Sequence, residues 1–312
     1  MPYAGELAAL ATAACWVVTA LSFEAAGRRV GSLTVNLLRL VLAVGLLAAW
    51  GAIAHGRPLP TDATAHAWGW LTLSGLVGFT FGDLCLFRAF VVLGSRLSTL
   101  MMALAPPLTA VIGWLVLGEV LTPVDLAGMA LTVGGVAWAV SERRRVPAVP
   151  GGTPATSGDT PATSDRASSH RAQGVLLGLG GALGQAVGLV LSKLGMGGYD
   201  PFAATHIRVM AGLAGYVALF TLLGRWGRVP AALADRRALA FTSVGAFFGP
   251  FLGVSLSLVS VQLIKAGVAA SLMAVTPVLI IPVLLLSGRE RVGAGGVLGA
   301  LVAVTGVVLL FR

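Results

Sequence analysis

The stretch from Gly82 to Val140 reads GDLCLFRAFVVLGSRLSTLMMALAPPLTAVIGWLVLGEVLTPVDLAGMALTVGGVAWAV. It holds two long apolar runs, at about 97–118 and 123–141. Each run is close to the roughly 20 residues that an α-helix needs to cross the hydrocarbon of a bilayer. Only a few residues separate the runs, so the two helices are expected to be antiparallel neighbours. The stretch therefore predicts membrane-spanning helices joined by tight turns.

The same pattern extends over the whole chain, of which 57% is hydrophobic and only 11% charged. A soluble domain carries about 25% charged residues, and lipid is the solvent that accepts so much apolar surface. Breaks near Ser95-Arg96 and near Gln262 to Lys265 are the shortest. The predicted fold is an all-α polytopic membrane protein with about ten transmembrane helices. The ten segments are about 7–24, 34–54, 69–92, 97–118, 123–141, 173–195, 203–224, 239–260, 264–287 and 292–311.

One gap between the apolar segments differs from the others. Residues 143–171 contain the sequence PATS twice and almost no large apolar residue. Such a Pro-, Ser- and Thr-rich composition cannot bury enough apolar surface to fold, so it predicts a disordered linker. The linker divides the chain into two five-helix units, 1–142 and 172–312.

The two units also match each other at a nearly constant spacing. Arg39 in Asn-Leu-Leu-Arg corresponds to Arg208 in Thr-His-Ile-Arg, 169 residues later, and Pro107 corresponds to Pro277, 170 residues later. Chance similarity among Gly, Ala, Leu and Val is the alternative to duplication. Because each unit has an odd number of spans, the second would enter the membrane from the opposite face. Inverted repeats of this kind are typical of secondary transporters, with the substrate site between the halves.

The order of motifs from Gly82 to Val140 resembles an EamA-type domain of the drug/metabolite transporter superfamily. The resemblance implies a ten-helix transporter, often an exporter of amino acids, metabolites or drugs. It does not name the cargo, the direction of transport, a coupling ion or the oligomeric state. In the second unit Leu-Gly-Glu is replaced by Ser287-Gly288-Arg289-Glu290. The motifs are Gly82-Asp83, Ala89 to Gly94, Pro107, Leu117-Gly118-Glu119, and Gly128 with Gly134-Gly135.

The net charge of +9 comes almost wholly from arginine, because Lys193 and Lys265 are the only lysines. The basic residues lie in short gaps between apolar runs, which favours membrane-flanking charge over a nucleic-acid partner. Of the 21 basic residues, four flank the side of the termini, fourteen the other side, and three lie within spans. The positive-inside rule then places the linker in the cytoplasm and both termini outside. Proteins that resemble this family are more often drawn with both termini inside.

No constellation of catalytic residues appears, so the chain is not expected to be an enzyme or to hold a cofactor. The four histidines are scattered in or near loops without metal-ligand spacing, and there is no Walker loop. The Gly-rich run from Gly178 to Gly184 is interpreted as close helix packing rather than a phosphate site.

Asp83 is the acidic residue nearest the middle of a predicted span, where an unpaired charge is costly. It is a candidate for a protonatable coupling group or a substrate contact. The alternative is an acid neutralised by a structural partner, for which Arg39 is the candidate. Its counterpart 170 residues later is Gly253, so the acid breaks the repeat. Arg88, five residues on, is a further candidate for a substrate or coupling contact, although it does not share a helix face with Asp83.

Arg39 and Arg208 are candidates to hold a substrate carboxylate, with snorkelling or anchoring of helix ends as the alternative. Trp16 lies near the middle of the first segment, where it could line a cavity or pack in the core. Gln185 and Gln262 are polar enough to contact substrate or to bridge helices. The remaining candidates are two prolines predicted to lie in the middle of helices, where each would free a backbone carbonyl and act as a hinge. These hinge candidates are Pro107 and Pro277.

These features predict secondary active or facilitated transport of a small metabolite by alternating access around a central cavity. The expected partners are a small-molecule substrate, the lipid bilayer and a coupling proton or other ion. The expected location is the cell membrane, which is the inner membrane in a Gram-negative cell. The alternatives are a lipid-linked headgroup translocase and a non-transporting membrane scaffold or sensor.

Overall fold

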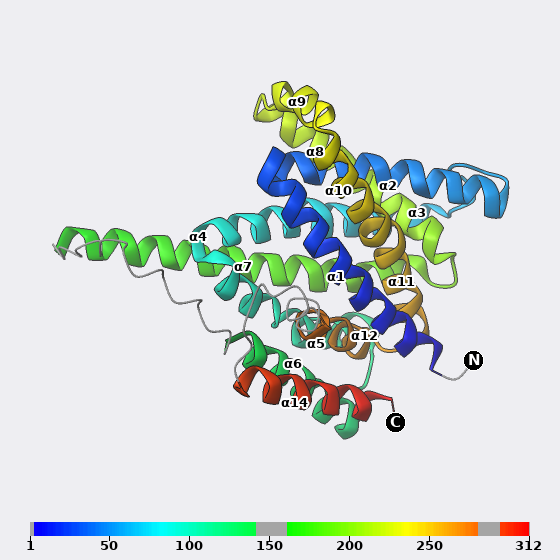
Figure 1. The fold of residues 1–312 in the computed structure, drawn as a ribbon. Helices are drawn as coiled ribbons and strands as arrows, with labels where there is room; N and C mark the ends of the chain where they lie inside the picture. The colour runs from blue at the N-terminus through cyan, green and yellow to red at the C-terminus, as the bar shows by residue number, and fades with distance from the viewer. Residues whose placement is uncertain (1–2, 142–160, 280–293, 312) are drawn as a thin grey trace.

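The computed structural model describes residues 3–141, 161–279 and 294–311. The described residues form helices and short connections, without a strand (Figure 1). The helices of the first half are α1 (Ala4–Val30), α2 (Ser32–His55), α3 (Ala65–Gly75), the π-helical turn η1 (Leu76–Gly82), α4 (Asp83–Met102), α5 (Ala105–Leu117) and α6 (Pro123–Ser141). Those of the second half are α7 (Pro161–Met196), α8 (Pro201–Leu222), η2 (Trp226–Arg228), α9 (Val229–Ala234), α10 (Arg236–Ala246), the π-helical turn η3 (Phe247–Gly253), α11 (Val254–Leu263), α12 (Ala266–Met273) and α14 (Ala294–Leu310).

Within the described residues, seven helices are long and apolar enough to cross a membrane. Three shorter apolar helices, Ala105–Leu117, Ala266–Leu279 and Gly295–Leu310, accompany them. The predicted all-helical, apolar architecture is confirmed, but length alone does not yield the predicted ten spanning helices. The seven are Ala4–Val30, Ser32–His55, Ala65–Ala89, Pro123–Ser141, Ala172–Met196, Pro201–Leu222 and Arg236–Leu263.

Helix α4 covers the position of the predicted break, Ser95-Arg96. It is nevertheless not one straight helix. A Cβ atom built on Gly178 would lie 3.0 Å from the Cβ of Met101 and 4.0 Å from the Cβ of Ala89. In a straight α-helix, twelve residues would separate Ala89 and Met101 by about 18 Å. The chain therefore folds back between these two residues. The matching break in the second half lies between α11 and α12, where it was predicted.

The helices of the two halves interleave instead of forming two separate bundles. Helix α6 packs on α14, α2 on α8, and α5 on α12, so each of these pairs joins corresponding helices. Helix α1 packs on α10 and α11, and its counterpart α7 packs on α3 and α4 (Figure 1). Exchanging the halves leaves this pattern of contacts unchanged, which is the arrangement that an inverted repeat produces.

Glycines allow α7 to pack backbone to backbone against η1 at the centre of the fold. A Cβ atom on Gly184 would lie 2.6 Å from the Cα of Gly82, and one on Gly188 would lie 3.0 Å from the Cα of Gly78. A side chain at either position would displace main chain, so these glycines act in close packing, as the sequence predicted.

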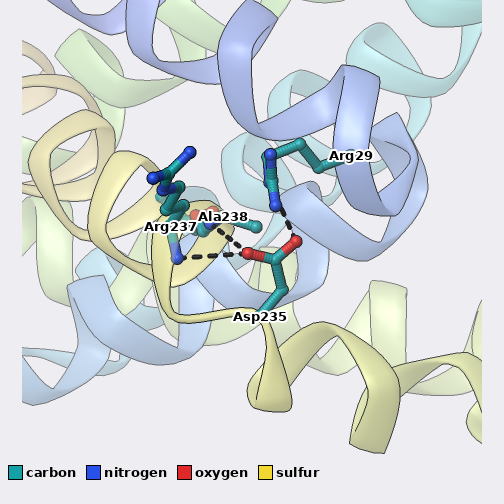
Figure 2. A network of polar contacts seen from close by, with 5 residues as sticks. Arg29, Asp235, Arg237 and Ala238 are labelled. Atoms are coloured by element: carbon teal, nitrogen blue, oxygen red, sulfur yellow. Dashed lines mark hydrogen bonds and ion pairs between the residues drawn. The ribbon is translucent and has the colours of Figure 1, made fainter.

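Polar contacts sort the connecting segments into two ends of the molecule. At one end Arg29 Nε donates to Asp235 Oδ2 over 2.8 Å, which joins the α1–α2 turn to the start of α10 (Figure 2). At the other end Tyr199 donates its hydroxyl to Asp62 over 2.9 Å, which joins the α7–α8 and α2–α3 connections. The chain termini lie at this second end, where the rings of Tyr3 and Phe311 are 5.7 Å apart. We call these the linker end and the termini end.

The structure corrects part of the predicted linker. Helix α7 begins at Pro161, so residues 161–171 are helical rather than disordered. This part of the segment lacks glycine, and proline is favoured in the first turn of a helix, where its missing N–H has no intrahelical acceptor. Residues 142–160, the rest of the predicted linker, lie outside the described residues.

Candidate functional site

A cavity of about 210 Å³ lies where the two halves meet. Most of its lining is apolar, and a few polar side chains converge on it, which is the usual character of a small-molecule site. Residues of α1, η1, α5 and α6 line it from the first half, and residues of α7, α8, α11 and α12 from the second. The lining residues include Trp16, Phe79, Pro106, Gln185, Arg208, Val254, Ser257 and Pro277.

Arg208 reaches the cavity from α8, whose N-terminus is capped by Asp200. The arginine is buried, with 6% of its surface exposed. Its guanidinium carbon lies 5.3 Å from the centre of the Phe79 ring, and its Nε has no hydrogen-bond partner. No carboxylate among the described residues pairs with it. An unpaired charge at membrane depth costs on the order of 3 kcal/mol, so this cation needs an explanation.

Asp83 meets Arg39 in a buried ion pair next to the cavity. The side chains of Arg39 and Asp83 are only 11% and 9% exposed. The other carboxylate oxygen of Asp83 accepts a hydrogen bond from Gln185 Nε2 over 3.2 Å. Arg39 also lies over the ring of Phe23, at 5.4 Å from its centre. The partner predicted from the sequence, Arg39, is therefore the one that neutralises Asp83, and Gln185 links this pair to the cavity wall.

The two π-helical turns correct the predicted counterpart of Asp83. Each turn covers seven residues and ends at a glycine, η1 at Gly82 and η3 at Gly253. Asp83 follows the first turn, so its structural counterpart is Val254 and not Gly253. Val254 lines the cavity. The second half thus has an arginine that corresponds to Arg39, but an apolar residue where the first half has its acid.

Two further candidates from the sequence lie away from the cavity. The side-chain amide of Gln262 donates to the carbonyl oxygens of Gly197 and Tyr199, over 2.9 and 3.0 Å, at the termini end. Arg88 lines a separate groove, together with Arg225 and other residues of α2, α4, α7 and α8. Trp16, in contrast, lines the cavity, which is one of the two positions predicted for it.

The prolines do not lie in the middle of helices, which corrects their predicted placement. Pro107 is in the first turn of α5, where the backbone N–H groups have no intrahelical acceptor in any case, so it frees no carbonyl. Pro277 follows a non-helical pair, Ala274 and Val275, and also lies at the start of a helical turn. Chain breaks thus lie beside the cavity in both halves, and the hinge role of the two prolines stays a prediction.

Four charged residues that the sequence did not single out as a group join the two halves at the termini end. Glu119, after α5, pairs with Lys193 of α7 over 2.6 Å. Its second carboxylate oxygen accepts the backbone N–H of Ala266, the first residue of α12, over 2.8 Å. Asp125 of α6 pairs with Lys265 over 2.6 Å. The signal available in the sequence was that the only two lysines flank spans of the second half, while Glu119 belongs to the Leu-Gly-Glu motif.

Comparison with known proteins agrees with this two-part arrangement. The family model described as "EamA-like transporter family" matches residues 3–141 and again residues 172–312. The chain belongs to the EamA-like transporter family. The two matches confirm the resemblance and the internal duplication, and they make the protein an integral membrane protein of a transporter family rather than of an enzyme family.

A solved structure titled "Crystal structure of protein" shares the fold of this EamA-family protein. The TM-score is 0.69 at 18% sequence identity, and the match covers 99% of this chain and 96% of the other. At this identity the likeness concerns the fold alone. No curated protein matches the chain.

Proposed function

We propose that this EamA-family protein carries a small metabolite across the cell membrane by alternating access, with the central cavity as the substrate site. The observation that carries the proposal is the position of the cavity: it lies between two inverted repeats, and both repeats contribute to its wall. Secondary transporters built from inverted repeats bind substrate at such an interface, and rocking of one repeat against the other exposes it alternately to the two sides.

The contacts between the halves at the termini end support a gate there. The pairs Glu119–Lys193 and Asp125–Lys265 each join a residue of the first half to one of the second. If the halves separate at this end, both pairs must break, so the ion pairs favour the state that is closed toward the termini. We expect a rocking motion to break these ion pairs and to leave the four charged side chains in contact with water.

Asp83 is our candidate for the group that couples transport to a proton. Its hydrogen bond with Gln185 connects the Asp83–Arg39 pair to the cavity wall. Protonation of Asp83 would weaken its attraction to Arg39 and so loosen the ion pair that links α2 to the start of α4. The alternative is that the pair is a fixed structural element, and the double variant Asp83→Asn with Arg39→Gln separates the two roles.

The direct test is a metabolite screen on proteoliposomes that contain the purified protein. We expect at least one small metabolite to accumulate faster than in protein-free liposomes, and a proton gradient to change its rate. The same vesicles can be loaded with a labelled lipid-linked sugar. Translocation of that lipid without movement of any metabolite would replace our proposal with headgroup translocation. Movement of neither would favour a scaffold.

A further inference from the structure

The charge of the cavity is unbalanced. Arg208 is the one charged residue among the described residues that line the cavity, and no aspartate or glutamate accompanies it. The ring of Phe79 lies beside its guanidinium, and the apolar side chain of Val254 lines the same cavity. The guanidinium also lies beside η1, because a Cβ atom built on Gly78 would be in ordinary contact with its Nη2, at 3.6 Å. The guanidinium is thus held against the wall without an acceptor for its Nε–H.

The other half of the molecule shows how this fold neutralises the same arginine. Arg39 occupies the corresponding position in α2 and pairs with Asp83, the residue that follows η1. The residue that follows η3 is Val254, whose side chain cannot accept a hydrogen bond or balance a charge. The second half therefore keeps the arginine and lacks its acid. The position that corresponds to the acid, Val254, lines the cavity.

The size and remaining lining of the cavity restrict what can fill this place. A volume of about 210 Å³ corresponds to roughly seven water molecules at about 30 Å³ each. Trp16 forms part of the wall, and its indole N–H is a hydrogen-bond donor without charge. The wall thus offers a cation and a neutral donor beside a mainly apolar surface. A small molecule with one anionic oxygen group and an apolar body matches these features.

We propose that Arg208 is the anion-binding residue of the central cavity, and that the cargo is a small carboxylate with an apolar body. The carboxylate takes the position that Asp83 holds relative to Arg39 in the other repeat. This inference rests on the proposed transport function, because it assigns the substrate class of the same site.

The first test supplies the missing acid within the protein. Val254→Asp places a carboxylate after η3, as Asp83 is placed after η1, and Val254→Asn is its uncharged match. If Arg208 is an unpaired cation in the cavity, the Asp variant should have an unfolding midpoint at least about 2 °C above that of the Asn variant. An Asp variant that is less stable than the Asn variant would overturn the assignment of a free cation, and no substrate is needed to see it.

The second test measures binding by the full-length protein in detergent. The probes are phenylacetate, hexanoate and indole-3-acetate, each beside its primary amide, and inorganic phosphate alone. We expect at least one carboxylate to raise the unfolding midpoint while its amide does not. Arg208→Gln should weaken that binding about tenfold or more, as loss of a charge-assisted hydrogen bond does, and Val254→Asp should abolish it.

Arg88→Gln is the matched control, because Arg88 lines a different groove. This variant removes one arginine from the same protein and should leave carboxylate binding unchanged. Carboxylates that stabilise no more than their amides would overturn the proposal, as would binding that Arg88→Gln and Arg208→Gln weaken equally. Stabilisation by phosphate and by no carboxylate would overturn the carboxylate assignment.

Failure of this inference can be distinguished from failure of transport. If Arg208→Gln vesicles carry a metabolite at the wild-type rate, the protein is a transporter and Arg208 does not bind its cargo. If carboxylates bind in an Arg208-dependent manner but none crosses the membrane of the proteoliposomes, the binding site stands and the proposed transport is wrong.

Discussion

Arg39 and Arg208 hold the same position in two repeats but meet different surroundings. Asp83 neutralises Arg39, whereas Arg208 faces a cavity without an acid. Keeping a buried cation without a partner destabilises a membrane protein, so it is expected only where function uses it. At the scale of single residues, the first repeat therefore holds a charge pair within the protein, and we propose that the second repeat leaves a charge for a ligand.

Replacing Asp83 with asparagine should affect both folding and transport. The Asp83→Asn variant leaves the buried guanidinium of Arg39 without its counter-ion, and breaking a buried pair in this way costs about 3–5 kcal/mol. We expect a lower unfolding midpoint and a strong loss of gradient-driven uptake in proteoliposomes. The loss of uptake alone does not separate a coupling role of Asp83 from a structural one.

The double variant Asp83→Asn with Arg39→Gln separates these roles because it removes both charges. We expect it to regain most of the lost thermal stability, since no unpaired charge remains in the core. If Asp83 carries the coupling proton, uptake driven by a proton gradient stays low in the double variant. Wild-type uptake by the double variant under every gradient would show that the pair is structural.

The sequence identified polar residues in and near the cavity better than it identified the residues with which they form ion pairs and hydrogen bonds. Asp83 was a candidate because it lies near the middle of a span and breaks the repeat, and its neutralisation by Arg39 was a stated alternative. The pairing of Glu119 with Lys193 was not predicted, since such a contact depends on how the two halves interleave. Gln262 looked equivalent to Gln185 by polarity, but it satisfies backbone carbonyls at the termini end.

At the scale of helices, packing without side chains holds α7 against η1. The contact between Gly184 and Gly82 is main chain against main chain, so an added methyl group has no flexible neighbour to displace. Gly134 of α6 lies in an open position instead, and the difference between the two kinds of glycine gives a test of the packing.

Gly184→Ala should destabilise the protein by about 1–3 kcal/mol, the usual cost of overpacking. Its new Cβ atom would lie 2.6 Å from the Cα of Gly82. Gly134→Ala is the control, because nothing lies within 4 Å of a Cβ built there. The control should be neutral or slightly stabilising, since alanine favours a helix over glycine. Unfolding midpoints in the same detergent measure both, and equal midpoints would contradict the close contact.

The start of α10 should respond to acid. Asp235 Oδ1 accepts the backbone N–H groups of Arg237 and Ala238, and its other oxygen accepts Arg29 Nε (Figure 2). The N–H of Ala238 in first place, and then Arg29, lower the pKa of Asp235 below its usual value. A carboxyl group with a lowered pKa stabilises the fold above its unfolded pKa, near 3.9, and that contribution is lost as the pH falls through the folded pKa.

Asp235→Asn tests this cap without removing the acceptor oxygen, since asparagine also caps helices well. We expect wild type to have the higher unfolding midpoint at pH 6, and the difference from Asp235→Asn to shrink as the pH falls below about 4. Titration of other groups affects both proteins alike. A difference that is constant between pH 6 and pH 3 would contradict a stabilising role of the Asp235 charge.

Apolar runs predicted where helices lie better than where they end. The chain breaks before Pro107 and Pro277 are flanked by alanine, leucine and valine, so hydropathy does not register them. The prolines were consequently placed in the middle of helices, whereas both lie in first turns. The helical start of α7 was missed for a related reason, because polar composition alone does not exclude a helix.

At the scale of the whole molecule, the odd number of spans in each half predicted inversion, and the symmetric pattern of contacts agrees with it. The sequence carried no sign that corresponding helices would pack on each other, α2 on α8 and α6 on α14. Such contacts bring both halves to one cavity and give two ends that the same rocking motion can open in turn. Because the helices interleave, both repeats contribute residues to the wall of the cavity.

The two ends also differ in charge, which bears on orientation. Contacts place Arg29 and Asp235 at the linker end, whereas Lys193 and Lys265 lie at the termini end. The sequence count assigns fourteen basic residues to the linker end and four to the termini end. Basic residues near short loops are retained in the cytoplasm, so we expect the linker end inside the cell and both termini outside. Relatives of this family are usually drawn the other way round.

Cysteine labelling of intact cells decides between the two orientations. The background lacks Cys15 and Cys85, and single cysteines are placed at Ser157, outside the described residues, and at an added C-terminal residue. A membrane-impermeant maleimide should label the C-terminal cysteine and leave Ser157→Cys unlabelled until the cells are opened. The reverse pattern would show that the charge rule fails here, which an inverted repeat tolerates because either face of the bundle can meet the cytoplasm. Labelling of both sites in intact cells would mean that Ser157 and the C-terminus lie on the same side of the membrane, and the number of spans in the second half would then be even.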